Sequence, residues 1–345
     1  MAHHRSPSER LPTGEPHLFP DRPAEGEVDR QTDDREVLAS VIVPSRGGRR
    51  RLETLLAHLE AQDEARFEVV VVLDGDVDDS QGLLRERATS LAVQVVAFPE
   101  NRGRSAALNA GMAAARGRVL VRCDDDLEPA RGFVRRHLAA HDGPAAGVVG
   151  LYRNVFPDTA YARTYGRRAD AAFRDAAYGV APDTTWRYWA GNASVTRETA
   201  AQVGGYDEAF RAYGWEDVDW GFRLHRLGIP VVLDPGLETT HRLSATTAAG
   251  RVERAFFSGA ARRQFVAKHE LHELAPPRPH SAWTRTVALV ARGLTESRSR
   301  RAGAMADTMA AVLPARAART LVGLLVEAAS EAGYHRGVVS DPAAV

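Results

Sequence analysis

The sequence predicts an α/β fold, a mostly parallel sheet with helices on both faces, followed by a helical C-terminal extension. Within residues 37–150, short apolar strand-like runs alternate with helical patterns in units of roughly 25 residues. After about residue 245, apolar residues recur at helical spacing only. No uncharged apolar run approaches the ~20 residues that span a bilayer, so we expect no transmembrane segment.

The order of the expected elements follows from this alternation. Residues 1–36, rich in Pro, Glu, Asp and Arg, are predicted to be a disordered leader. Residues 37–150 and 151–245 form the two halves of the α/β domain, and residues 246–345 form the helical extension. The expected strands are 41–43, 67–73, 93–98, 119–123, 189–196, 229–233 and 236–240. The expected helices are 49–62, 81–90, 104–115, 215–228, 252–269, 282–295 and 305–329, the last broken at Pro314.

The composition excludes several classes of protein. The 345 residues carry 45 basic and 45 acidic side chains, and this balance argues against a nucleic-acid-coating protein. The lone Cys123 excludes an intramolecular disulfide, and we expect a cytoplasmic location. Lys268 is the only lysine among the basic residues. Either a GC-rich genome or a demand for bidentate guanidinium groups accounts for this bias.

Two acidic clusters follow expected strands, at the sheet edge where ligands of open α/β folds bind. Asp74-Gly75-Asp76 ends the second strand, and Asp124-Asp125-Asp126-Leu127-Glu128 ends the fourth. Carboxylates this close repel one another unless a cation lies among them, which favours Mg²⁺ or Mn²⁺. The alternative is that Asp126 or Glu128 only begins the following helix.

A third acidic cluster, Glu216-Asp217, falls in the first turn of an expected helix. These residues either complement the helix dipole or act in catalysis. The dipole is expected to lower the pKa of a carboxyl group there and keep it ionised, as a general base requires. Downstream, His241 follows an expected strand and is either structural or a metal ligand.

Seven motifs in this order resemble the inverting glycosyltransferases of family 2, which have the Rossmann-like GT-A fold. The resemblance covers about residues 38–245. The motifs are 41–46 (VIVPSR), 70–75 (VVVLDG), 101–111 (NRGRSAALNAG), 124–126 (DDD, as the DXD motif), 191–193 (GNA), 203–208 (VGGYDE) and 214–219 (GWEDVD). The last region is also similar to galactosyltransferase-type enzymes.

The resemblance implies a sugar transfer from a nucleotide-sugar donor bound by residues 37–150 to an acceptor bound by residues 151–245. It implies Asp217 as the base with Glu216 beside it, and Asp126, Asp124 and His241 around Mn²⁺ or Mg²⁺. Asp74 is expected to accept a hydrogen bond from the donor base, which favours a UDP-sugar. The donor-binding residues implied are Pro44, Ser45, Arg46, Asp74, Asn101, Gly103, Arg104, Asn109, Asp124, Asp125, Gly191 and Asn192.

The acceptor side is less defined. Residues 152–189 hold nine aromatic residues without regular periodicity, and aromatic rings either stack on sugars or pack in a core. Trp186, Trp189, Tyr213 and Trp215 are the acceptor candidates. The acceptor itself is expected to be a carbohydrate, a lipid-linked sugar or a small molecule.

Several alternatives stay open at this point. Arg46 and the arginines at 49–51 replace the usual residues after the first strand, and either reach the diphosphate or start a solvated helix. The chain is alternatively a sugar nucleotidylyltransferase or a non-catalytic carbohydrate-binding protein. The C-terminal helices cover the catalytic domain, pair in a homodimer, or rest on a membrane surface as a peripheral contact.

Overall fold

The computed structural model describes residues 29–30, 36–87, 89–211, 214–242 and 245–337. Most of the expected leader 1–36 therefore lies outside the described residues, although Asp29–Arg30 forms a short strand, β1, against β4. Tyr213 also lies outside the described part.

The main sheet confirms the predicted α/β class. Its strand order is β1-β4-β3-β2-β5-β9-β7-β10. The bounds are β2 Ala39–Ser45, β3 Phe67–Asp74, β4 Ala92–Phe98, β5 Val119–Cys123, β7 Gly147–Val149, β9 Asn192–Thr196 and β10 Val231–Leu233. Strands β4, β3, β2 and β5 are parallel, whereas β9 runs antiparallel to both β5 and β7. Because β9 is reversed, its first residues meet the last residues of β5.

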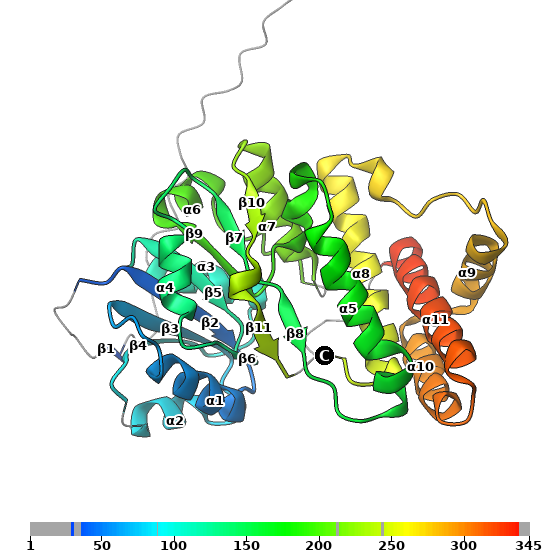
Figure 1. Cartoon of the computed structure of the whole chain (residues 1–345), viewed down its shortest axis with the longest axis horizontal. Coiled ribbons are helices and arrows are strands. Elements are labelled where there is room, and N and C mark those ends of the chain that lie inside the picture. The colour runs from blue at the N-terminus through cyan, green and yellow to red at the C-terminus, as the bar shows by residue number, and fades with distance from the viewer. Residues whose placement is uncertain (1–28, 31–35, 88, 212–213, 243–244, 338–345) are drawn as a thin grey trace, which may run out of the picture.

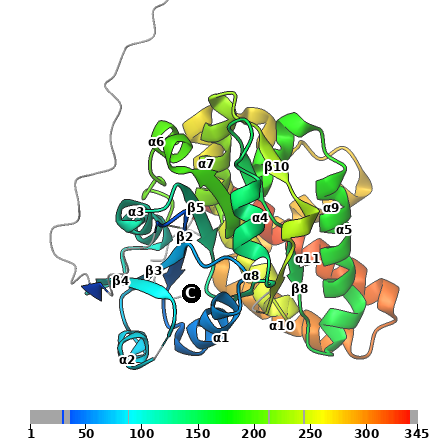
Figure 2. The same ribbon diagram turned by 60° about the vertical axis from the view of Figure 1, so that its left-hand side comes forward.

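Alternating residues of the central strands enter two separate cores, and this places helices on both faces of the sheet (Figures 1 and 2). Val41 and Val43 face α1 (Arg49–Glu60) and α4 (Phe133–Ala139). Ile42 faces α3 (Arg104–Ala114) and α7 (Trp215–Arg226). The remaining helices of this region are α2 Ser80–Glu86 and α6 Arg197–Val203.

A second, three-stranded sheet lies beside the acidic edge, in the order β6-β11-β8. Its strands are β6 Leu127–Glu128, β8 Tyr152–Asn154 and β11 Thr239–His241, after the short turn η3 Pro235–Leu237. The register pairs His241 with Leu127 on one side and with Asn154 on the other. The expectation that Asp126 or Glu128 starts a helix is therefore wrong, since α4 begins at Phe133.

The segment 152–189 contains regular structure that the sequence did not predict. A π-helical turn, η1 (Ala162–Gly166), leads into α5 (Arg167–Tyr178), and the 3₁₀ turn η2 (Pro182–Tyr188) follows. Within α5 only Ala177 is buried, which explains why no apolar periodicity marks this helix.

The C-terminal helices pack on one another and on the domain, on the side of the molecule away from β4 (Figure 1). They are α8 Ala248–His269, α9 Ala282–Gly293, α10 Glu296–Ala310 and α11 Ala315–Arg336, with the turn η4 His272–Leu274 after α8. A Cβ at Gly259 would lie 1.9 Å from the Ser330 carbonyl oxygen, and one at Gly333 would lie 1.9 Å from that of Phe256. Glycine thus permits the close crossing of α8 and α11. Within the described residues, every helix is too short or too polar to cross a membrane.

Candidate active site

A buried arginine forms the centre of the acidic sheet edge. Arg122, in β5, is 5% exposed, and its guanidinium donates to the carboxylates of Asp124 and Asp217. Its Cζ lies 5.8 Å from the centre of the Tyr206 ring. Arg122 therefore joins the end of β5 to the first turn of α7. Arg122 was not predicted from the sequence. The sign that could have revealed it is a charged residue inside an apolar strand, just before the three aspartates.

Asp217 is the most strongly perturbed acid of this cluster. Burial raises the pKa of Asp217 to about 7; Arg122 opposes this shift, while Glu216 and Asp124 add to it. The expectation that the helix dipole would lower this pKa is wrong, because the loss of solvent outweighs the dipole. A carboxyl group with a pKa near 7 matches the requirement for a general base at neutral pH.

Glu216 lies beside Asp217 and is 3% exposed. Its Oε2 accepts a hydrogen bond from the amide of Gly214 at 3.0 Å, and Gly214 itself has a φ of +99° at the start of α7. Its Oε1 lies 3.7 Å from the Arg104 guanidinium, whose side chain is 46% exposed at the start of α3. Glu216 thus fixes the first turn of α7 and holds a half-exposed arginine next to it.

The three consecutive aspartates point in different directions, because the chain turns at Asp125 and Asp126 after the end of β5. Asp124 faces Arg122 at 3.1 Å. Burial alone would raise the pKa of Asp124, but Arg122 and Arg104 lower it. A Cβ at position 191 would lie 2.1 Å from the Asp124 carboxylate, so Gly191 is required beside it. Gly191 thus contributes to the site because its lack of a side chain leaves room for the Asp124 carboxylate.

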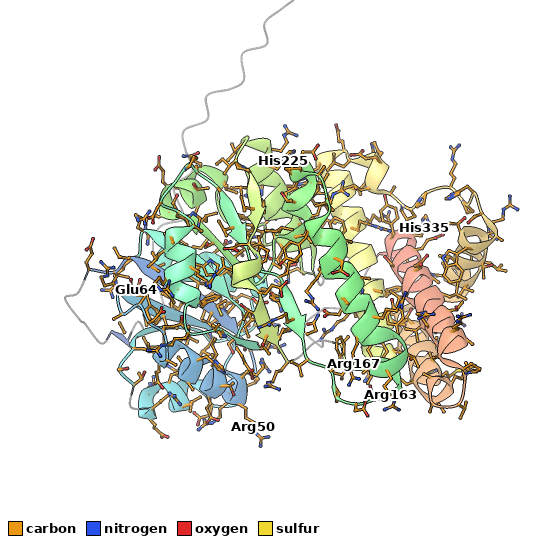
Figure 3. The ribbon with its side chains drawn as sticks, viewed as in Figure 1. Arg50, Glu64, Arg163, Arg167, His225 and His335 are labelled. Atoms are coloured by element: carbon orange, nitrogen blue, oxygen red, sulfur yellow. The ribbon has the colours of Figure 1, made fainter. Side chains whose placement is uncertain are left out.

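Asp125 faces the opposite side and pairs with α1. It is 8% exposed, accepts from Ser45 Oγ at 2.5 Å, and forms two bonds with Arg51 at 2.9 and 3.0 Å. Arg49 pairs with Asp79, whereas Arg50 projects away from the protein (Figure 3). Arg49, Arg50 and Arg51 thus begin α1, as the helix-start alternative expected, and Arg49 and Arg51 also pair with carboxylates of neighbouring segments. Pro44 is half-buried and Arg46 is exposed, at the end of β2.

Asp126 and His241 form a pair that fits a divalent cation. Asp126 Oδ2 lies 3.0 Å from His241 Nε2, and His241 Nδ1 lies 2.5 Å from Asn154 Oδ1. The amide nitrogen of Asn154 donates to Asp170, so its oxygen is the acceptor, and His241 Nδ1 carries a proton. Nε2 of a neutral ring then faces a carboxylate with its lone pair, an arrangement that a shared cation or a proton satisfies.

This pair is smaller than the predicted set of three ligands. The described residues contain no group of three or more His, Cys, Asp or Glu side chains placed to hold a metal ion. Asp124 is therefore not assembled with Asp126 and His241. Two protein ligands still suit Mg²⁺ or Mn²⁺, which keep several waters and bind substrate phosphates.

Asp74 ties β3 to the loop before α3. Its carboxylate accepts from the amides of Arg102 at 2.6 Å and Gly103 at 2.9 Å. Asn101 Oδ1 accepts from the same Gly103 amide at 3.0 Å, and Gly103 has a φ of +95°. Asp74, Asn101 and Gly103 are thus brought together, in one turn at the acidic edge.

The two predicted donor-binding asparagines bind protein groups instead. Asn109 bonds the backbone of Tyr206 through both its oxygen (2.6 Å) and its nitrogen (2.9 Å). Asn192 is fully buried, and its side chain bonds Leu237, Thr239 and His137. Both amides hold separate segments together, and their contact with a donor stays a prediction.

Three of the aromatic acceptor candidates can be located. Trp186 and Trp189 are 5% and 4% exposed and stack on Phe265 and Trp220, respectively. These two rings are core residues here, with almost no surface for an acceptor. Trp215 is half-buried, and its indole nitrogen donates to Ser258 of α8.

His137 and His141 form a buried pair next to Asn192. We predict that this pair makes the stability of the protein depend on pH. Burial lowers the pKa of His137 to about 3 and that of His141 to about 4, and both rings bond Ser194 Oγ at 2.8 Å. As pH falls from 6.5 toward 4, these two histidines bind protons in the unfolded chain but stay neutral in the folded chain. Each histidine then removes about 1.4 kcal/mol of stability per pH unit.

Urea denaturation between pH 7.5 and 5 measures this dependence, with His137→Asn as the comparison. Asp217 contributes with the opposite sign, because its raised pKa makes the folded state gain protons first as pH falls. The difference between wild type and His137→Asn isolates the histidine. Equal pH slopes for the two proteins would contradict the assignment.

Comparisons with known proteins find two family models that match parts of this chain. Residues 40–202 match Glycosyl transferase family 2, and residues 176–245 match the N-terminal domain of galactosyltransferase. The chain is 25% identical to the uncharacterized glycosyltransferase YfnE of Bacillus subtilis, over 59% of this chain and 64% of that protein. It is 28% identical to validoxylamine A glucosyltransferase of Streptomyces hygroscopicus subsp. jinggangensis, over 59% of this chain and 56% of that one.

A solved structure shows a similar fold. The mannosyltransferase PcManGT of Pyrobaculum calidifontis, in complex with GDP-Man and Mn²⁺, superposes with a TM-score of 0.57 at 20% identity. The match covers 88% of this chain and 89% of that one. The chain thus spans 56 to 64% of the length of the two curated relatives named, but most of a solved glycosyltransferase chain.

Proposed function

We propose that this chain, which belongs to glycosyl transferase family 2, is a metal-dependent inverting enzyme that moves a sugar from a nucleotide-sugar donor to an acceptor hydroxyl. The observation that carries the proposal is the position of Asp217. Its carboxylate is buried, has a raised pKa, and is held by Arg122, which also holds Asp124 at the end of β5. The side chain of Arg122 thus joins the proposed base, Asp217, to Asp124 at the acidic edge of the sheet.

In this proposal Asp217 accepts the proton of the attacking acceptor hydroxyl. Arg122 orients the Asp217 carboxylate, and Glu216 keeps the first turn of α7 in place. The half-exposed guanidinium of Arg104 supplies positive charge at the start of α3, where it can meet an anionic diphosphate. The base acts directly on the acceptor, so a single displacement with inversion needs no covalent enzyme intermediate.

Asp126 and His241 are proposed as the protein ligands of Mn²⁺ or Mg²⁺. A cation bound there would stabilise the negative charge of the departing nucleoside diphosphate. The supporting observation is that His241 Nε2 lies 3.0 Å from Asp126 Oδ2 while His241 Nδ1 contacts Asn154.

A UDP-sugar remains the proposed donor. Asp74 uses one lone pair on each oxygen for the amides of Arg102 and Gly103, which leaves others to accept the imide N–H of uracil. The acceptor is proposed to be a carbohydrate, a lipid-linked sugar or a small molecule. The relative named validoxylamine A glucosyltransferase falls within this range.

A nucleotide-sugar hydrolysis screen with Mn²⁺ and Mg²⁺ tests the function. We expect nucleoside diphosphate release from a UDP-sugar that stops with excess EDTA. Formation of nucleoside triphosphate and sugar 1-phosphate from the same donor, only when pyrophosphate is added, would instead identify a sugar nucleotidylyltransferase. If the protein binds sugars in a metal-dependent way but releases no nucleoside diphosphate from any donor tested, it is the non-catalytic carbohydrate-binding alternative.

The solvent face of α10 is the proposed site of any membrane contact. Met305, Met309 and Val312 are exposed in a stripe one to two turns apart, and Arg298 and Arg301 continue it. Flotation with anionic liposomes, compared with a Met305→Glu/Met309→Glu variant, tests this contact. Equal flotation of both proteins would discard it, and a concentration-dependent mass in sedimentation would indicate the homodimer instead.

A further inference from the structure

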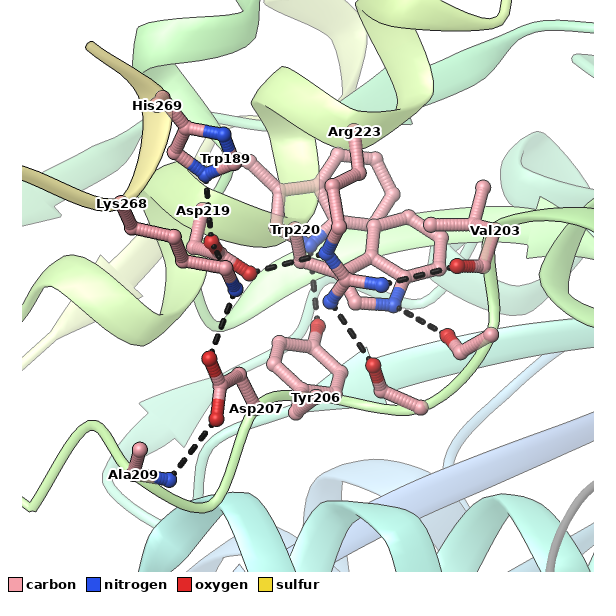
Figure 4. Close-up of polar contacts among 12 residues, drawn as sticks. Trp189, Val203, Tyr206, Asp207, Ala209, Asp219, Trp220, Arg223, Lys268 and His269 are labelled. Atoms are coloured by element: carbon pink, nitrogen blue, oxygen red, sulfur yellow. Dashed lines mark hydrogen bonds and ion pairs between the residues drawn. The ribbon is translucent and has the colours of Figure 1, made fainter. Parts of the chain in front are cut away.

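An ion cluster around the buried Asp219 joins the end of α8 to the middle of α7, with the side chains of Lys268 and Asp207 each about one third exposed (Figure 4). Asp219 of α7 is fully buried. Its Oδ1 accepts from Lys268 Nζ at 2.7 Å and from His269 Nε2 at 2.8 Å, and its Oδ2 accepts from Arg223 at 2.9 Å. A carboxylate removed from water requires such partners, because an unpaired buried charge is strongly destabilising.

The same cluster holds the segment 203–209, which precedes α7. Lys268 Nζ lies 2.7 Å from Asp207 Oδ2, so its ammonium bridges two carboxylates from different parts of the chain. Arg223 donates to the carbonyl oxygens of Val203 at 2.8 Å and Gly205 at 2.7 Å. The segment is therefore fixed to both α7 and α8.

Both fixed elements meet again at Arg122. Helix α7 carries Asp217, which bonds the Arg122 guanidinium, and the segment 203–209 carries Tyr206, whose ring lies against it. On the far side, Asn109 of α3 bonds the backbone of Tyr206. A displacement of α7 relative to this segment would thus change the position of Asp217 against Arg122.

We propose that Lys268 is a positioning residue for the general base, and this rests on the proposed function. Its ammonium bridges Asp219 and Asp207 and so fixes Asp217 against Arg122. A compact ammonium with three donors suits two carboxylates at 2.7 Å each, whereas a planar guanidinium favours one carboxylate in a bidentate pair. The single lysine of this arginine-rich chain lies where that difference matters.

The test compares Lys268→Met, which removes the charge, with Lys268→Arg, which restores a cation. Arg87→Met is the matched control, because Arg87 forms a half-buried pair with Glu60 at 2.9 Å on the opposite side of the sheet domain. We expect Lys268→Met to lower kcat by about tenfold to a hundredfold. The donor KM should stay within about twofold, and Arg87→Met should keep the wild-type kcat. Lys268→Arg should recover only part of kcat, because a guanidinium favours one of the two carboxylates that Lys268 bridges.

A purely structural role gives a different result. If Lys268→Met keeps the wild-type kcat while its unfolding temperature falls, as for Arg87→Met, the proposal is overturned. It is also overturned if Lys268→Arg is no better than Lys268→Met.

Hydrogen exchange separates this proposal from the proposed function. We expect faster exchange of amides 203–209 and 214–222 in Lys268→Met than in the wild type or Arg87→Met, without any substrate present. If the wild type turns over no donor, the proposed function is wrong. The exchange experiment still tests whether Lys268 fixes α7 and the segment 203–209. Equal exchange in wild type and Lys268→Met would show that Lys268 fixes neither element.

Discussion

Asp217→Asn abolishes sugar transfer and leaves the affinity for nucleoside diphosphate within about threefold. The amide keeps the size of the side chain but cannot take a proton from the acceptor, and loss of a general base typically costs 10²- to 10⁴-fold in rate. Steady-state transfer and calorimetric titration of the diphosphate measure the two quantities separately.

The pH profile of the wild type adds a second readout. Because burial raises the pKa of Asp217 to about 7, kcat/KM should rise with pH through this value as the carboxyl group loses its proton. Glu68→Gln is a control, since Glu68 is also buried but lies at the opposite end of β3, bonded to Ser40 and Arg116. Undiminished turnover by Asp217→Asn would remove Asp217 from the base role.

Asp126→Ala is expected to lower the affinity for nucleoside diphosphate at least about tenfold in Mn²⁺, and to remove the effect of EDTA on it. The substitution deletes one of two protein ligands and leaves His241 without its carboxylate partner. Calorimetry in Mn²⁺ and in excess EDTA measures both proteins. Asp63→Ala, which breaks a surface pair with Arg135, is the control.

Two results would contradict the metal proposal. One is an equal affinity of the wild type in Mn²⁺ and in EDTA. The other is an Asp126→Ala protein whose diphosphate binding still responds to Mn²⁺ as the wild type does. Either would mean that the Asp126–His241 contact is held by a proton.

The alternating strands and helices could be predicted from sequence because buried parallel strands are almost wholly apolar. Val119–Cys123 is strand β5 with the expected bounds, and the break at Pro314 separates α10 from α11. Helix α5 was not predicted, since a helix that buries one alanine leaves no apolar stripe. Glycine and proline positions marked boundaries well, but weakly amphipathic surface helices escaped the pattern.

The site residues could be chosen from the sequence by their residue type and their order along the chain. The directions in which their side chains point depend on tertiary contacts, which the sequence does not show. The triplet 124–126 reads as one ligand cluster, yet the turn at 125–126 directs Asp125 to Arg51 and Asp126 to His241. The pKa of Asp217 could not be inferred from its helix position, because desolvation arises from the segments packed around it. Aromatic residues such as Trp186 gave no signal that separates a core from a binding surface.

The partners of Asp219 also bear on where this chain can be divided. The family matches end at residue 245, but the two basic groups that α8 supplies to the buried carboxylate come after it, at 268 and 269. A fragment ending at 245 would carry the sequence that matches the transferase models, but its Asp219 would have lost two of its three side-chain partners. Residue 245 is thus a limit of family resemblance, while the cooperative folding unit extends through the crossing of α8 and α11.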